Sequence, residues 1–275
     1  MKIRQELGIA MVAVPVLAIV YFLYAMEGPD SRFDPWAVAA PADIPRAETS
    51  VSEIQAVEQK ARAGDAEAQT HLAIHYADAD GVARNYDRAL AWYRLAAAKN
   101  HGLAQRNIGL MYSRGQSVPQ DYAKALEWYR IAAENGNARA FNDLGLAYAN
   151  GQGVSRDYLT AGEWYKKAAA EGNTHAAYNL GLMYAEGQGY ARDDAEALKW
   201  FLKSAQAGYP KAQIKVAEAY REGRGTTPDL VRAYAWATKA ADSATEGKSL
   251  RDILSATLSE AQREGAKSLL RSGAL

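Results

Sequence analysis

The distribution of apolar and polar residues divides the chain into an N-terminal apolar run and a long region with helical periodicity. One block of that region shows the pattern clearly. Ala104, Ile108 and Tyr112 stand at i, i+4 and i+8, which predicts one buried stripe on a helix. Ala125 and Trp128 begin a second stripe in the same block. The pattern therefore predicts two consecutive amphipathic helices joined by a turn.

This two-helix block recurs every 36 residues without an insertion or a deletion. The tyrosine position returns as Tyr76, Tyr148, Tyr184 and Tyr220, and the tryptophan position as Trp92, Trp164, Trp200 and Trp236. Self-similarity at a fixed period of this length indicates helix pairs stacked into a solenoid. The sequence thus predicts an all-α fold with five repeats over residues 65–244.

The flanks of the array no longer follow the full repeat. Residues 50–64 match only the second half of a repeat and end near Gly64, which predicts an N-terminal capping helix. Residues 245–275 predict C-terminal capping helices, the first beginning at Lys248 and the second capped by Ser259.

The apolar run from Leu7 to Met26 contains no charged residue. A helix of this length spans about 30 Å, the thickness of the hydrocarbon core of a bilayer. Lys2 and Arg4 precede the run, and positively charged flanks stay in the cytoplasm. Residues 1–27 therefore predict a single-pass anchor in the cytoplasmic (inner) membrane, with the repeats on the exported, periplasmic side.

The alternative is a cleaved signal peptide, which would release a soluble secreted or periplasmic protein. The bulky Phe22–Tyr24 stretch and the length of the run favour the anchor. Residues 28–49 contain four prolines and predict an extended linker. Within it, Phe33 and Trp36 either rest at the lipid headgroups or on the first repeat, or dock a partner.

The repeat resembles the Sel-1-like repeat, a relative of the tetratricopeptide repeat. One copy carries every residue of the motif: Ala140, Leu144, Gly145, Tyr148, Gly151, Gly153, Val154, Asp157, Tyr158, Ala161, Trp164, Tyr165, Ala168, Ala169 and Gly172. The resemblance covers residues 51–243 and implies a right-handed superhelical scaffold for protein–protein contacts, often at bacterial membranes or in exported compartments. The expected function is a membrane-anchored scaffold, adaptor or accessory subunit of a membrane-associated complex; the alternative is a soluble regulator or inhibitor.

Composition and motifs give no support to other functions. The 32 basic and 32 acidic residues balance, so no charge excess favours nucleic acid. No catalytic constellation is visible, and the chain is predicted to be neither an enzyme nor a cofactor-binding protein. His71 and His75 have a spacing that could place two imidazoles on one metal ion, but no full ligand set accompanies them. No metal site is therefore predicted.

The predicted partner-binding residues lie on the first helices of the repeats, which line the concave face in the related tetratricopeptide fold. An amide-rich column, a variable column beside it and an apolar column supply them: Asn107, Asp143 and Asn179; Arg106, Asn142 and Tyr178; and Leu110, Leu146 and Leu182. Side-chain amides can bond an extended peptide backbone in both directions. The amide column could instead bond a neighbouring repeat, and the apolar column could be helix packing.

Overall fold

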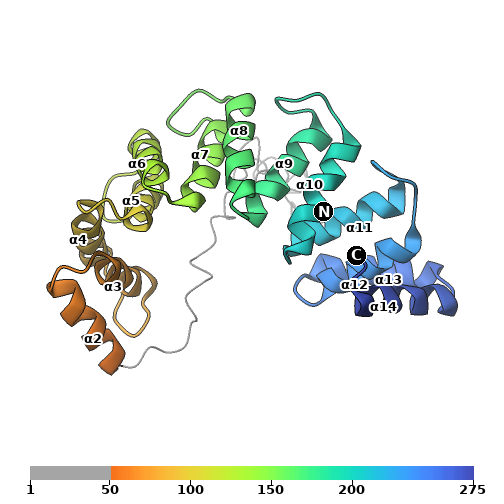
Figure 1. The fold of residues 1–275 in the computed structure, drawn as a ribbon, viewed down its shortest axis with the longest axis horizontal. Helices are drawn as coiled ribbons and strands as arrows, with labels where there is room; N and C mark the ends of the chain where they lie inside the picture. Colours follow the sequence, from red (N-terminus) through yellow and green to blue (C-terminus); the bar gives the residue numbers. More distant parts are fainter. Residues whose placement is uncertain (1–50) are drawn as a thin grey trace, which may run out of the picture.

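The computed structural model describes residues 51–275 (Figure 1). The predicted anchor over residues 1–27 and the predicted linker over residues 28–49 lie outside these described residues. Within residues 51–275, none of the helices has both the length and the apolar character that crossing a bilayer requires.

The described part of the chain is built from short helices of similar length, arranged in pairs. They are α2 (Val51–Arg62), α3 (Ala66–Asp78), α4 (Tyr86–Ala97), α5 (Gly102–Arg114), α6 (Tyr122–Glu134), α7 (Ala138–Asn150), α8 (Tyr158–Ala170), α9 (Thr174–Glu186), α10 (Asp194–Gln206), α11 (Pro210–Glu222), α12 (Leu230–Ala241), α13 (Thr245–Thr257) and α14 (Glu260–Ser272). The five pairs from α3–α4 to α11–α12 follow the repeats of the sequence. The all-α solenoid is therefore confirmed.

The helix pairs stack side by side in a curved array (Figure 1). Helix α2 lies at one end of the arc, and α13 and α14 lie at the other. In this view α3 and α5, the first helices of their repeats, lie nearer the inside of the arc than α4 and α6. Helices α3 and α5 therefore contribute to the inner face, as the resemblance to the tetratricopeptide fold implies.

Each second helix begins at a side-chain cap. The Asp121 carboxylate accepts a hydrogen bond from the Lys124 backbone N–H at 3.0 Å, which satisfies one of the free donors of the first turn of α6. The equivalent caps in the other repeats are Asn85, Asp157, Asp193 and Asp229. A side-chain oxygen of Asp or Asn therefore caps the second helix in all five repeats.

A glycine in three of the first helices allows an aromatic ring of the second helix to pack directly on the backbone. A Cβ atom added at Gly145 would lie 2.5 Å from the Tyr165 ring. Gly109 meets Tyr129 and Gly181 meets Phe201 in the same way. Close packing explains why these helices carry glycine despite its low helix propensity.

The C-terminal cap differs from the prediction at one boundary. Helix α13 begins at Thr245 rather than at Lys248. Gly247 lies in its first turn, and a Cβ atom there would be 2.6 Å from the backbone carbonyl carbon of Ala240. The glycine thus permits close contact with α12 instead of breaking the helix. Ser259 caps α14 as predicted, in a reciprocal capping box with Gln262.

Candidate partner-binding surface

The nine predicted partner-binding residues lie on α5, α7 and α9, and most of them are buried. Asn107 and Leu110 are partly exposed. The seven buried residues are Arg106, Asn142, Asp143, Leu146, Tyr178, Asn179 and Leu182. Asn179 is 0% exposed and Asp143 is 3% exposed, so their side chains are not open to a peptide backbone in this structure. The expectation of an exposed amide column needs correction at these two positions.

The amide column contacts tyrosines on the second helix of the preceding repeat. Burial raises the pKa of the Tyr93 hydroxyl, and its hydrogen bond with the Asn107 side chain offsets part of this effect. Burial likewise raises the pKa of Tyr165, which contacts the Asn179 side chain. One repeat further along, Phe201 stands at the position of Tyr165, and Lys215 stands at the position of Asn179. These contacts favour the alternative interpretation, in which the column joins neighbouring repeats.

Asp143, the acidic member of that column, forms a buried ion pair with Arg106. The Arg106 Nε–Asp143 Oδ2 distance is 2.5 Å and the Nη2–Oδ1 distance is 3.3 Å, which makes the contact bidentate. Burial alone would lower the pKa of the Arg106 guanidinium, but the charge of Asp143 and its hydrogen bond raise it overall. The pair joins α5 to α7 and neutralises two charges that would otherwise be buried alone.

The variable column also contacts neighbouring repeats. Thr70, which stands at the position of Arg106 one repeat earlier, has its Oγ1 2.9 Å from His101 Nδ1 at the start of the next repeat. The Tyr178 ring packs edge-on against the Tyr209 ring, with centroids 5.2 Å apart. Together with the Arg106 pair, these contacts show that variation in this column accompanies different junctions between repeats. The expectation that these side chains lie open to a partner is not met.

A pocket of about 460 Å³ opens between the end of α5, the turn that follows it, the start of α6 and the C-terminal half of α7. Its volume is in the range typical of ligand sites, about 300–1,000 Å³. Three of the nine predicted residues line it: Leu110, Asp143 and Leu146. The other lining residues are Ser113, Arg114, Gln116, Gln120, Tyr122, Ala125, Tyr129, Ala147, Asn150 and Gln152. The pocket thus has a mainly apolar floor and a polar rim.

A small side chain in α7 distinguishes this pocket from equivalent places in the adjacent repeats. Ala147 lines the pocket, and the residues one repeat away on either side are Met111 and Met183. Both methionines are buried, at 3% and 0% exposure. The alternation of Met, Ala and Met at this core position is visible in the sequence, but it departs from the regular repeat positions on which the site prediction rests.

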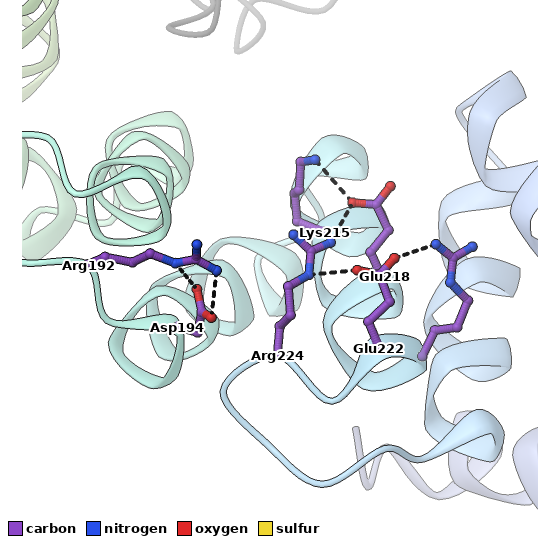
Figure 2. Close-up of polar contacts among 7 residues, drawn as sticks. Arg192, Asp194, Lys215, Glu218, Glu222 and Arg224 are labelled. Carbon is purple, nitrogen blue, oxygen red and sulfur yellow. Dashed lines mark hydrogen bonds and ion pairs between the residues drawn. The ribbon is translucent and has the colours of Figure 1, made fainter.

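The equivalent place two repeats further along has a different chemistry, shown in Figure 2. There Arg192 pairs with Asp194 at 3.0 Å, and Arg224 pairs with Glu222 at 2.8 Å. Lys215 pairs with Glu218 at 3.1 Å, in place of the Asp143 and Leu146 of the pocket. The pocket-lining Gln120, Tyr122, Asn150 and Gln152 correspond to Arg192, Asp194, Glu222 and Arg224. This place in the repeat therefore changes from apolar and amide side chains to ion pairs along the array.

The histidine pair does not form part of a metal-binding cluster. His75 is 8% exposed and its Nδ1 lies 3.0 Å from Asp80 Oδ2. Within residues 51–275, no three His, Cys, Asp or Glu residues gather as a metal ion would require.

The stacked helix pairs and their fixed period define an α/α solenoid of the interaction-repeat class. Within that class the chain belongs to the Sel1 repeat family. Five consecutive Sel1 repeats match residues 66–101, 102–137, 138–173, 174–209 and 210–244.

Solved structures of other proteins have the same architecture. A Sel1 repeat protein from Oxalobacter formigenes is 29% identical, with a TM-score of 0.63 over 72% of this chain and 82% of that chain. An immunity protein from Pseudomonas aeruginosa is 20% identical, with a TM-score of 0.51 over 78% of this chain and 81% of that chain. At this identity the second likeness shows the fold alone. No curated protein matches the chain significantly.

Proposed function

We propose that the protein is a membrane-anchored scaffold, adaptor or accessory subunit that binds a partner protein or extended peptide through the inner face of its solenoid. Sel1 repeat proteins act in protein–protein interaction, which supports the general role. The observation that carries the choice of face is the pocket on the first helices, lined by Leu110, Asp143 and Leu146. Partly exposed Asn107 lies on the same helix as Leu110.

The proposed anchor is the uncharged run from Leu7 to Met26, with Lys2 and Arg4 on its cytoplasmic side. The repeats would then lie in the periplasm, beside partners in the same membrane. Tethering to one membrane raises the effective concentration of the two partners, so a modest affinity is sufficient. The partner would be a subunit of a membrane or periplasmic complex.

Site-specific photo-crosslinking in native membranes tests the proposed binding face. A crosslinker replaces Asn107 on α5 or, as a matched control, exposed Leu95 on α4. We expect a defined crosslinked partner from position 107 and none of that mass from position 95. The same product from both positions, or from position 95 alone, would contradict binding through the inner face.

Membrane fractionation with N-terminal sequencing tests the anchor separately. We expect the full-length chain to remain with the inner membrane after a high-salt wash and to begin before Leu7. A soluble protein whose N-terminus lies beyond Met26 would instead establish the released regulator.

A further inference from the structure

The pocket between α5, α6 and α7 has an apolar floor that the fold leaves unfilled. Leu110, Leu146 and Ala147 contribute to this floor. In the adjacent repeats Met111 and Met183 fill the position of Ala147, and both are buried. An apolar side chain from another molecule can therefore occupy space that a methionine of this fold occupies elsewhere.

The charge at the pocket is unbalanced. Asp143 at the floor is already neutralised by Arg106. Arg114 at the rim is exposed and forms no ion pair within residues 51–275. Two repeats further along the chain, Glu186 stands at the position of Arg114 and Glu222 stands at the position of Asn150. An unpaired guanidinium with an open surface favours a carboxylate, which it can bind in a bidentate manner.

The rim also has side-chain amides free to bond a peptide backbone. Gln120 is engaged, since its Nε2 donates to the Ser113 carbonyl at 2.8 Å and to the Tyr122 hydroxyl at 2.9 Å. The side chains of Gln116, Asn150 and Gln152 make no hydrogen bond to the part of the chain that the structure describes. Each can donate to and accept from an extended chain.

We propose that this pocket binds one apolar side chain of an extended partner segment, with an acidic residue next to it held by Arg114. The amides of Gln116, Asn150 and Gln152 bond the segment's backbone and set its direction. The proposal rests on the proposed function, because it gives the partner's chemistry at one part of the inner face. Two repeats further along, Glu186 stands at the position of Arg114, so the guanidinium that holds the acidic residue is missing there.

Two pools of labelled synthetic decapeptides test this inference on the full chain in mild detergent. Both have a central leucine among randomised uncharged residues; it is followed by aspartate in one pool and by lysine in the other. We expect the Leu-Asp pool to bind about tenfold more tightly, a typical effect of one charge-assisted contact.

Two variants locate the binding. Ala147→Met introduces the residue of the adjacent repeats and should weaken binding of the Leu-Asp pool about tenfold, with the helical circular dichroism unchanged. Arg114→Glu, at an exposed position, should reverse the preference toward the Leu-Lys pool. Arg94→Glu on α4 makes the same charge change outside the pocket lining and should leave the preference unchanged.

Equal binding of the two pools, binding of neither, or unchanged Leu-Asp affinity in folded Ala147→Met would overturn the inference. The Asn107 crosslink separates this failure from failure of the proposed function. If the chain that carries the crosslinker at position 107 still captures its native partner, the scaffold role stands and only the assignment of the pocket is wrong.

Discussion

Single polar residues hold neighbouring repeats together at the centre of the array. Asn107 contacts Tyr93 and Asn179 contacts Tyr165, each across a junction between repeats. At the next junction the aromatic residue is Phe201, which has no hydroxyl group, and the residue that faces it in the repeat is Lys215 instead of an amide. The Tyr93 hydroxyl gains a hydrogen-bond partner in Asn107, which lowers the cost of burying it.

The Arg106–Asp143 pair makes the strongest prediction at this scale. Asp143→Ala leaves the Arg106 guanidinium buried and unpaired, so we expect the free energy of unfolding to fall by about 3–5 kcal/mol. Urea denaturation followed by circular dichroism measures the change.

The exposed pair of Arg192 and Asp194 is the matched control. Asp194→Ala should cost less than about 1 kcal/mol, because water screens this pair. The double variant Arg106→Met with Asp143→Leu should recover most of the stability lost in Asp143→Ala. Equal losses for Asp143→Ala and Asp194→Ala would show that the buried pair does not stabilise the junction.

At the scale of helices, glycine sets how closely the two members of a repeat approach. Gly145 in α7 lies against the Tyr165 ring of α8. Gly265 in α14 is also within a helix, but the nearest atom to an added Cβ is 3.9 Å away, on Val231. The same residue type therefore has a packing role in one helix and none in the other.

The two glycines predict opposite effects of one substitution. Gly145→Ala forces the Tyr165 ring to move, and overpacking of this kind costs about 1–3 kcal/mol. Gly265→Ala gains helix propensity and should stabilise its helix by roughly 0.5–1 kcal/mol. Thermal unfolding of both variants measures the difference. A stabilised Gly145→Ala protein would mean that the helices do not approach as the structure shows.

At the scale of the whole molecule, each repeat contacts mainly its neighbours. The stability of each repeat therefore depends on the interfaces with the repeats beside it. Helices at the ends have a neighbour on one side only. Helix α14 buries only Ala266, whereas α9 buries eight of its residues, including Leu180 and Met183. The C-terminal end of the array therefore buries fewer side chains than its middle, and its local unfolding should cost less free energy.

Native-state hydrogen exchange should reveal this gradient. We expect the amides of α14 to exchange orders of magnitude faster than those of α7 to α9, because local opening of an end helix exposes little apolar surface. Uniform protection along residues 51–275 would indicate one cooperative unit instead of a linear array.

Most of the fold follows from the sequence because its determinants are local and repeated. The period, the caps such as Asp121 and the close-packing Gly145 all stand at fixed offsets. The start of α13 could not be predicted, since Gly247 looks like a helix breaker until its contact with Ala240 is known.

The candidate site was less predictable, because burial at a junction depends on two repeats at once. Offset alone does not show that Asp143 pairs with Arg106 or that Asn179 lies against Tyr165. The signal for the pocket is a departure from the pattern, Ala147 between Met111 and Met183. Leu110 and Leu146 belong to the apolar column, for which the sequence left partner binding or helix packing open, and both line the pocket.

The most direct test of the account compares hydrogen–deuterium exchange in the native complex with exchange in the free chain. If the partner binds the inner face at the pocket, exchange should slow at the end of α5, in the turn at residues 115–121 and in the C-terminal half of α7. Helix α4, which contributes no residue to the pocket lining, should be unchanged. Slower exchange confined to the second helices α4 and α8, with the pocket unprotected, would contradict the account.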